Sequence, residues 1–361
     1  MSEKILVINP GSTSTKIAVY DGEQEVWKES ISHSLEELKN YPTIFDQKDM
    51  RKALIEKALA EHGDTLDSFA GFVSRGGAVG PVKAGAIEVN DILVNILHYH
   101  PVDQHASNIG AAIAKELADS VGKKAYIYDG ITVDEMSELN QITGLKGIRR
   151  PARGHNLNTR AAALRYCREN GLEYAKTDLI VVHLGGGITM NLHVGGKMVD
   201  MVMDEDGMFA PERAGMIPTF ALVRMAYSGE YTQAELMKQL QRRGGVISHL
   251  GTANMQEVEK MIADGDEYAA LVYRAMALNV AKYIGELAVS NRGHIDAIIL
   301  TGGLAYSEMF TDMIKEYASF LGKIVILPGE NEMAALAGGA LRVLRGEEEA
   351  TILGEDYEKN L

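Results

Sequence analysis

Short apolar runs alternate with turn residues over the first 32 positions of the chain. The runs KILVI (4–8) and IAVY (17–20) flank the polar turn GSTST, and Asp21-Gly22 then gives a two-residue hairpin signal. Apolar runs of this length between turn residues are typical of β-strands. The pattern predicts three strands here, with an antiparallel beginning.

Other segments place apolar residues at helical spacing. The predicted helices cover 46–62, 107–121, the amphipathic run 158–171 that contains Cys167, and ENEMAALAGGALRVLRG at 330–346. Gly338 and Gly339 in the last helix cost about 1 kcal/mol each against alanine. We therefore expect this helix to pack closely against a neighbour.

Further strands are predicted in FAGFVSRGG (69–77) and in AYIYDG, which ends at Asp129. Between them, VGPVKAGAIEVN (79–90) is interpreted as a long loop. The acidic tail from 347 onward is interpreted as a solvated end.

Two distant segments share one pattern of apolar strand, glycine turn and second strand. With Gly11 placed on Gly186, the apolar positions Ile5, Leu6, Val7, Ile17 and Val19 fall on Ile180, Val181, Val182, Leu192 and Val194. A second match sets AYIYDG, from Ala125, against AIILTGG, from Ala297. The matches predict an internal duplication of an α/β unit, with a ligand cleft between the halves.

At 361 residues the chain exceeds the usual range of roughly 100 to 200 residues per domain, so two domains are expected. The formal net charge of -14 disfavours nucleic acid and anionic lipid as partners. The single cysteine, Cys167, cannot form an intramolecular disulfide, and MSEKILVINPG is neither a signal peptide nor a membrane span. A cytoplasmic location is expected.

The turn INPGSTSTK resembles a phosphate-binding loop but differs from the known helical types. A P-loop needs a glycine directly before its Lys-Ser/Thr pair and a helix after it. GSTSTK lacks that glycine, and the strand IAVY follows it, which also excludes a dinucleotide-binding fingerprint. Two such hairpins, with their hydroxyl and amide donors, could hold a polyphosphate between the domains.

The complete set of motifs resembles the acetate kinase family, within the acetate and sugar kinase, heat-shock chaperone and actin superfamily. VINPGSTSTK is similar to the family's amino-terminal signature, and VVHLGGGIT to its second phosphate motif. VSRGG, YDG, ARGHNLNTR, PERAG, LTGGLA and ENEMA follow in the family's order. The chain lacks the longer insertions of acetate kinases and reads HPVDQHASNIG and RGHNLNTR, so within the family it most resembles the butyrate kinases.

This resemblance implies an α/β fold of two duplicated ribonuclease H-like, or actin-like ATPase, domains. Each domain would have a mixed sheet flanked by helices, with a nucleotide cleft between them. Residues 1–132 plus 333–361 would form the first domain, closed by the returning C-terminal helix, and 133–332 the second, with the adenosine site. A homo-oligomer, a dimer or larger, is also implied.

The resemblance further implies which residues bind ATP and Mg²⁺. The nucleotide and phosphate residues would be Asn9, Ser12, Ser14, Lys16, His183, Gly185, Gly186, Gly187, Thr189, Gly302, Gly303 and Leu304. Glycines suit such positions because a side chain would hold the nucleotide away from the backbone. Magnesium would be associated with Asn9, Asp129 and Glu332, since this ion prefers a few carboxylates plus phosphate oxygens and water.

Phosphoryl transfer to a carboxylate brings two anions together, so the site needs cations for both. By resemblance, the catalytic residues would be Arg75, Asp129, His155, Arg213 and Glu332. The two arginines would bind the carboxylate and stabilise the transferring phosphoryl group, to which the histidine would donate. Arg75 stands in FVSRGG, whereas acetate kinases have a pattern like HRxVHGG, so its register departs from the family's.

Gly154 is also implied in substrate binding. Acetate kinases tend to have a bulky aromatic residue directly before the histidine that matches His155, and this chain has Gly154 there. The departure predicts a deeper acyl pocket, compatible with a four-carbon or branched chain.

The cluster of His98, His100 and His105 invites a zinc interpretation, but no cysteine or second close pair completes such a ligand set. We interpret HYHP (98–101) as part of a loop on the substrate side.

The resemblance implies reversible phosphoryl transfer from MgATP to butyrate by direct in-line attack, alongside a phosphotransacylase that exchanges the acyl phosphate. Isobutyrate, other branched acids, propionate or acetate are alternative acceptors, because one methylene in an apolar pocket gives only about 1 to 3 kcal/mol of discrimination. A non-catalytic or chaperone-like nucleotide switch is an alternative of another class.

Overall fold

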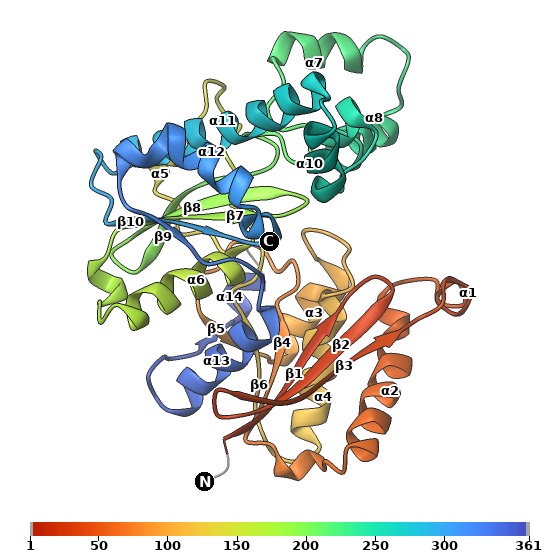
Figure 1. Cartoon of the computed structure of the whole chain (residues 1–361). Coiled ribbons are helices and arrows are strands. Elements are labelled where there is room, and N and C mark those ends of the chain that lie inside the picture. Colours follow the sequence, from red (N-terminus) through yellow and green to blue (C-terminus); the bar gives the residue numbers. More distant parts are fainter. Residues whose placement is uncertain (1–2, 359–361) are drawn as a thin grey trace. The chain divides into compact units, whose positions relative to one another are not determined.

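The structure is a computed structural model that describes residues 3–358 (Figure 1). The chain divides into two compact units. The first unit comprises the chain up to Asp134 and again from Asn331, and the second runs from Glu135 to Glu330. No helix within residues 3–358 is long and apolar enough to cross a membrane.

The first unit contains a mixed seven-stranded sheet in the order β12-β5-β6-β4-β1-β2-β3. Its strands are β1 (Lys4–Pro10), β2 (Ser14–Asp21), β3 (Gln24–Ser32), β4 (Gly71–Arg75), β5 (Ala86–Glu88), β6 (Ala125–Tyr128) and β12 (Thr351–Ile352). Strands β1, β2 and β3 form the predicted antiparallel hairpins, and β4 lies parallel to β1. At the Asp21-Gly22 turn, Gly22 has a φ of 58°.

Helices cover both faces of this sheet. They are α1 (Leu35–Leu38), α2 (Lys48–Glu61), α3 (Asp91–Tyr99), α4 (Asn108–Asp119), α13 (Glu332–Leu344) and α14 (Glu355–Glu358), with short 3-10 turns at Phe45–Gln47 and Leu66–Ser68. Consecutive residues of β1 from Ile5 to Ile8 are fully buried, so both faces of the strand are covered. Helices α4 and α13 both pack on β1, β4 and β6 (Figure 1).

The predicted close packing of α13 is confirmed at Gly339. A Cβ atom there would come within 2.5 Å of the Tyr128 ring, so only glycine lets the helix approach β6 this closely. Gly338 has no such neighbour, since its nearest atom belongs to Arg342 of the same helix.

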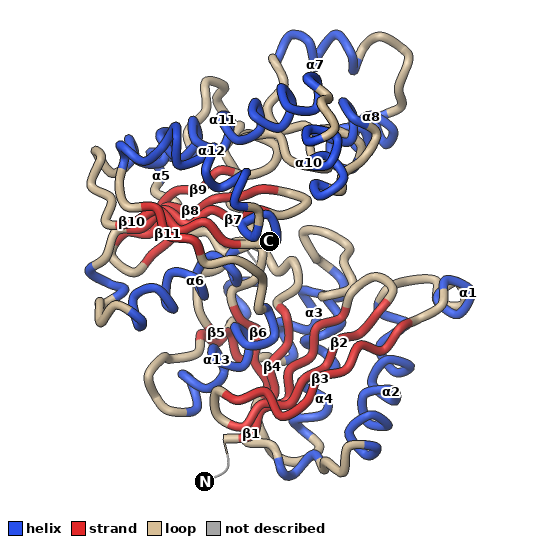
Figure 2. The backbone as a smooth tube through the Cα atoms, in the orientation of Figure 1, coloured by secondary structure: helices blue, strands red, loops and turns tan. Residues whose placement is uncertain are grey.

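The second unit contains a five-stranded mixed sheet in the order β11-β10-β7-β8-β9 (Figure 2). Its strands are β7 (Leu179–Leu184), β8 (Ile188–Val194), β9 (Lys197–Val202), β10 (Ala297–Thr301) and β11 (Ile324–Ile326). Its helices are α5 (Glu138–Gln141), α6 (Asn156–Glu169), α7 (Thr219–Ala226), α8 (Gln233–Arg242), α9 (Val246–Leu250), α10 (Met255–Ala263), α11 (Glu267–Ser290) and α12 (Glu308–Ala318), with 3-10 turns at Tyr174–Lys176, Gly303–Tyr306 and Ser319–Leu321.

Alternate residues of β7 enter two different cores. Leu179 and Val181 join the core beneath α6, whereas Ile180 and Val182 join the larger core beneath α11. This follows from the two-residue repeat of a strand, which sends successive side chains to opposite faces. Cys167 is buried in the α6 core, and burial raises the pKa of its thiol.

The sheet topology supports one part of the predicted duplication and corrects two others. Strands β1–β3 of the first unit and β7–β9 of the second are equivalent antiparallel meanders. The strand parallel to the first member is β4 in one unit and β10 in the other. The match of β6 with β10 was therefore wrong by one strand, because β10 occupies the place of β4.

The sequence match that places Gly11 on Gly186, here called the overlay, also misplaced the second strand of the hairpin. Ile5 pairs with Tyr20, and Ile180 pairs with Leu192. Placing Ile5 on Ile180 therefore puts Tyr20 on Leu192, where the overlay had Ile17. The two hairpins differ in length, and a comparison without gaps cannot accommodate that difference.

Two further expectations about the first unit were wrong. The segment 79–90 contains β5, and the helix α3 follows it directly. The tail includes β12, which pairs in parallel with β5, and Glu348 accepts a hydrogen bond from the backbone of Ala86 at 3.2 Å. The last three residues of the tail lie outside the described part of the chain.

Candidate active site

Three predicted site residues of the first unit meet around one carboxylate. Glu332 is the first residue of α13, where a negative charge is favourable at the helix N-terminus. It accepts a hydrogen bond from Asn9 Nδ2 at 2.9 Å and lies 3.2 Å from Arg75 Nη1. The ends of β1 and β4 and the start of α13 thus bring an amide, a guanidinium and a carboxylate together.

Asp129 lies directly after β6 and is buried. Its carboxylate accepts the Gly85 N–H at 2.7 Å, and its own N–H donates to the Gly85 carbonyl at 3.2 Å. Its φ of 42° lies in the left-handed region, which aspartate tolerates better than most residues. Backbone strain of this kind clusters at functional sites.

The first hairpin presents its polar side chains at the tip of β1 and β2. Lys16 pairs with Asn9 across the ladder and is exposed. Ser12 is also exposed and Ser14 is half-buried. The Gly11 N–H donates to the Ser14 carbonyl at 2.7 Å and closes the turn.

Arg75 has a histidine near it. Burial, followed by the positive charge of Arg75, lowers the pKa of His105, whose Nδ1 lies 2.8 Å from Ser107 Oγ. By contrast, His98 stacks on Phe45 and Tyr99 with ring centroids 4.1 and 4.0 Å away.

The interpretation of HYHP as a loop was wrong for its first two residues, since His98 and Tyr99 are the last residues of α3. Within residues 3–358, no group of three or more His, Cys, Asp or Glu side chains is arranged to hold a metal ion.

In the second unit, the glycine turn between β7 and β8 is packed against the loop that carries Arg213. The Glu212 N–H donates to the Gly186 carbonyl at 3.0 Å. A Cβ atom at Gly187 would lie 3.7 Å from the Arg213 side chain, and one at Gly185 would come within 2.8 Å of His183 Nε2. A side chain is therefore excluded at Gly185, whereas Gly187 would be in ordinary van der Waals contact with Arg213.

Arg213 lies beside two acidic residues. Its Nε donates to Asp204 Oδ2 at 2.9 Å, and Nη1 lies 3.7 Å from Glu212. Nη1 is buried and has no hydrogen-bond partner among the residues described. A guanidinium held by Nε keeps its terminal nitrogens for an anion such as a carboxylate or phosphate.

Two histidines of the second unit stack face to face. The rings of His155 and His183 have centroids 3.8 Å apart and an interplanar angle of 8°. His155 Nδ1 and its backbone N–H lie 3.0 and 3.2 Å from Thr189 Oγ1. Because the Asn158 amide donates to His183 Nδ1 at 2.8 Å, His183 Nε2–H points to Glu330, 3.2 Å away.

Gly154 borders the same cluster. A Cβ atom at this position would lie 3.3 Å from Asn156 Oδ1 and 3.5 Å from Thr189 Oγ1. A Cβ atom before His155 would therefore be tight against Asn156 and in ordinary van der Waals contact with Thr189, which contacts the histidine.

The predicted adenosine motif follows β10. Gly302 has a φ of 89°, and a Cβ atom there would lie 2.4 Å from the Leu184 carbonyl oxygen, so only glycine fits. At Gly303 a Cβ atom would meet nothing within 4 Å, and the residue is exposed. Leu304 is half-buried against the large core of the unit.

Several residues of these clusters were missed by sequence reasoning. Asp204 carries no local pattern that separates it from other polar residues, whereas Asn158 and Glu330 lie in the motifs ARGHNLNTR and ENEMA but were given no role. Arg51 did carry a signal, because it occupies the buried face of α2 that Ile55 and Leu59 continue.

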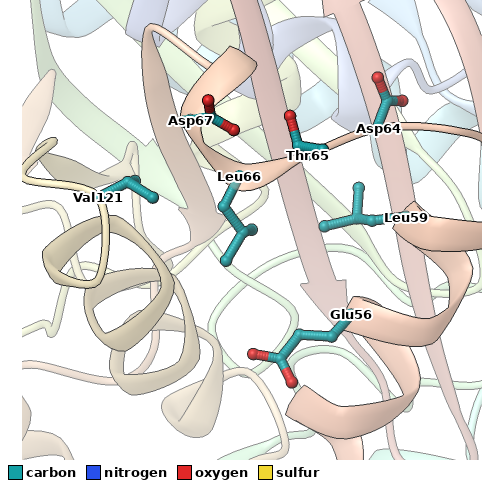
Figure 3. Close-up of a pocket in the computed structure, with 7 residues that line it drawn as sticks. All are labelled: Glu56, Leu59, Asp64, Thr65, Leu66, Asp67 and Val121. Atoms are coloured by element: carbon teal, nitrogen blue, oxygen red, sulfur yellow. The ribbon is translucent and has the colours of Figure 1, made fainter.

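A cavity of about 480 Å³ lies elsewhere in the first unit (Figure 3). It is lined by Glu56, Leu59, Asp64, Thr65, Leu66, Asp67 and Val121. None of the predicted site residues lines it. Asp64 is already bound to Lys4 and to Trp27 Nε1, which donates at 2.8 Å.

Comparison with known proteins places the chain among carboxylate kinases. Residues 156–326 match the model of the Acetokinase family. The chain is 44% identical to a "Probable butyrate kinase 2" of Caldanaerobacter subterraneus subsp. tengcongensis, over 97% of this chain and 99% of the relative. It is 43% identical to "Butyrate kinase 1" of Clostridium acetobutylicum, over 96% of this chain and 98% of the relative.

Solved structures show the same fold. The acetate kinase of Porphyromonas gingivalis superposes with a TM-score of 0.78 at 17% identity, covering 95% of this chain and all of the other. A propionate kinase from Francisella tularensis gives a TM-score of 0.73 at 18% identity, over 93% and 98% of the two chains. The predicted actin-like ATPase fold, with mixed sheets flanked by helices, is confirmed. Together with the full-length relatives, these findings show that the chain belongs to the acetokinase family.

Proposed function

We propose that the protein is a butyrate kinase that transfers the γ-phosphoryl group of ATP to butyrate, reversibly, giving butyryl phosphate and ADP. The observation that carries the proposal is the environment of Arg213. This residue lies on a loop packed against the glycine turn, and its buried Nη1 has no hydrogen-bond partner among the described residues. A cation beside a phosphate-type turn suits a reaction between two anions. The full-length relatives named butyrate kinase support butyrate as the acceptor.

In this proposal, the acceptor and the transferring group are bound by cationic side chains. Arg75 and Arg213 bind the carboxylate and stabilise the charge on the phosphoryl oxygens, where guanidinium groups give bidentate contacts. His155 donates a hydrogen bond to the transferring phosphoryl group. Direct in-line attack needs these residues only for positioning and electrostatic stabilisation.

The nucleotide is proposed to bind to the glycine turns and hairpins. Asn9, Ser12, Ser14 and Lys16 of the first unit would contact phosphates. In the second unit, His183, Gly185, Gly186, Gly187 and Thr189 would contact phosphates, and Gly302, Gly303 and Leu304 would lie under the adenosine. The exposed, uncrowded Gly303 suits close approach of a ribose or base.

Magnesium is proposed to associate with Asn9, Asp129 and Glu332. The chemistry of these donors fits the ion, because two carboxylates and an amide carbonyl offer the oxygen ligands that Mg²⁺ prefers alongside phosphate and water. When bound, the ion neutralises phosphate charge. Glu332 already orients Asn9 and Arg75, so it links the metal-associated and acceptor-binding residues of the first unit.

Gly154 is proposed to leave room for the acyl chain, which favours four-carbon or branched acids over acetate. Butyryl phosphate would be exchanged with a phosphotransacylase, and the protein is expected to act in the cytoplasm as a homo-oligomer. Closure around the nucleotide would exclude water and limit ATP hydrolysis.

One experiment tests the reaction and ranks its acceptors. The protein is incubated with MgATP and straight or branched carboxylic acids of two to six carbons, and hydroxylamine traps any acyl phosphate as a hydroxamate. The largest yield of hydroxamate is expected with butyrate, and isobutyrate is expected to give hydroxamate as well. Absence of hydroxamate with every acid, while ATP still binds, would contradict a carboxylate kinase and favour a nucleotide switch.

A further inference from the structure

Arg51 lies behind the first hairpin and is fully buried in the middle of α2. Its two terminal nitrogens donate hydrogen bonds to five oxygen atoms at 2.8 to 3.2 Å. Nη1 donates to the carbonyls of Gly11 and Ser14 and to Thr15 Oγ1, and Nη2 donates to the Ser12 carbonyl and to Gln47 Oε1. Four of these five acceptors belong to the first hairpin, two in the turn between β1 and β2 and two at the start of β2.

These contacts fix the orientation of the peptide units in the turn. The carbonyls of Gly11, Ser12 and Ser14 are all directed at one guanidinium, which is planar and rigid. The N–H groups of Ser12 and Thr13 have no hydrogen-bond partner among the residues described. A turn with its carbonyls bound and its amide donors unoccupied is suited to an anion.

The charge of Arg51 is not paired. No carboxylate of the described residues lies within 4.0 Å of its nitrogens, and Nε has no hydrogen-bond partner among them. Burial lowers the pKa of the guanidinium to about 10, which still leaves it charged at neutral pH. A buried cation without a counter-ion is costly, so an anion on the turn would offset part of that cost.

We propose that Arg51 is the positioning residue of the first phosphate-binding hairpin. It holds the turn so that the Ser12 and Thr13 amides face the nucleotide phosphates, and its unpaired charge increases their affinity. This inference rests on the proposed role of the hairpin in nucleotide binding. Arg51 acts through the turn and does not itself touch the substrate.

The test compares variants of the full-length protein by equilibrium binding of ADP without any carboxylic acid, and by KM for ATP and for butyrate. Arg51→Lys keeps the charge and loses the forked contacts. Because it loses two or more hydrogen bonds to the turn, ADP affinity and KM for ATP are expected to worsen about tenfold, a factor that corresponds to about 1.4 kcal/mol. KM for butyrate is expected to change less than about twofold.

Ile55→Ala is the matched control, since Ile55 is fully buried one turn further along the same helix. It should lower the midpoint of thermal unfolding but leave ADP affinity unchanged. If Arg51→Lys does not fold, Thr15→Val removes one hydroxyl acceptor of Arg51 and should weaken ADP binding in the same direction.

Wild-type ADP affinity in a folded Arg51→Lys or Thr15→Val variant would overturn the inference, as would equal loss of ADP affinity in Ile55→Ala. A wild-type protein that does not bind ADP would overturn it as well. Failure of the wild type to form hydroxamate would contradict the proposed reaction only, because the ADP measurement needs no acceptor.

Discussion

His155 and His183 stack with centroids 3.8 Å apart and rings tilted by 8°. The stack joins the residue before α6 to the end of β7, and each ring has its own polar partner. Thr189 contacts His155, whereas Asn158 and Glu330 fix both nitrogens of His183. His183 is therefore placed to orient the ring that is proposed to donate to the phosphoryl group.

Replacing His183 with phenylalanine tests this orientation. The stack would be kept, but the hydrogen bonds to Asn158 and Glu330 would be lost, each worth about 1 kcal/mol. We expect kcat to fall about tenfold, with less change in KM for butyrate. Steady-state kinetics measure both values, and His155→Ala should reduce kcat further.

Asn158→Asp is the comparison that separates orientation from simple loss of the ring. It keeps His183 and changes the group bound to Nδ1 from a donor to an acceptor, so kcat should fall here too. Full activity in both His183→Phe and Asn158→Asp would show that the hydrogen bonds of His183 have no role in turnover.

Asp204 is expected to set the position of Arg213. In Asp204→Ala the Nε of Arg213 loses its charged acceptor, a contact worth about 1.5 to 3 kcal/mol. We expect kcat/KM for butyrate to fall by about tenfold or more, and ADP affinity to stay within about twofold. Arg213→Ala should be the more severe variant, with most turnover lost and ATP binding largely intact.

Arg274→Ala is the matched control for this prediction, because Arg274 is an exposed arginine of the same unit that pairs with Glu316. It should behave as wild type. Near-normal turnover of Arg213→Ala would remove Arg213 from the active site, and Asp204 with it.

The glycine turns and first hairpins could be predicted from the sequence because their signals are local. The run IVVHLGGGIT contains both a strand and its turn, and in the structure β7 is followed by the glycine turn and then by its antiparallel partner β8. The dipeptide Asp21-Gly22 likewise predicted the hairpin of β2 and β3 from local sequence alone. Family motifs then supplied roles for residues far apart in the chain, such as Asn9, Arg75 and Glu332, and the structure brings these three together.

The residues that sequence reasoning missed depend on tertiary packing. Asp204 matters because its loop carries it to Arg213, and nothing nearby in the chain encodes that contact. Strand β5 has three residues and gains its order from β6 and β12, so the Gly- and Pro-containing segment was interpreted as a loop. Arg51 was not singled out, although its spacing to Ile55 placed it on the apolar face.

Gly302 and Gly303 are expected to respond in opposite ways to alanine. At Gly302 a Cβ atom would overlap the Leu184 carbonyl oxygen at 2.4 Å, and the φ of 89° is unfavourable for alanine. Gly302→Ala should destabilise the protein by about 1 to 3 kcal/mol or more. Denaturant unfolding measures this change.

Gly303→Ala is the adjacent control, because a Cβ atom there meets nothing within 4 Å. Its unfolding free energy should equal that of the wild type, while KM for ATP should rise if the adenosine approaches this backbone. Equal stability of the two variants would contradict the steric argument, and an unchanged KM for ATP in Gly303→Ala would remove Gly303 from the nucleotide site.

His193 is expected to make folding stability fall in acid. The side chain is fully buried on β8, and its Nδ1 lies 2.8 Å from the Tyr174 hydroxyl. Burial, with a smaller effect from the charge of Arg160, lowers its pKa from 6.5 to about 3. Between these values the unfolded chain binds a proton that the folded chain excludes, so stability is full above pH 6.5 and decreases as the pH falls toward 3.

The size of the effect follows from linkage, which gives about 1.4 kcal/mol per pH unit for one proton. Between pH 7.5 and 5, His193 should therefore remove about 2 kcal/mol from the free energy of unfolding, measured with denaturant at each pH. The difference in unfolding free energy between pH 7.5 and pH 5 should be smaller by that amount in His193→Gln. In Tyr174→Phe it should persist, because that change removes the hydrogen bond and keeps the titrating ring. A His193→Gln protein with the full wild-type difference would assign the acid sensitivity to other groups, of which His33 and His105 also have pKa values lowered by burial.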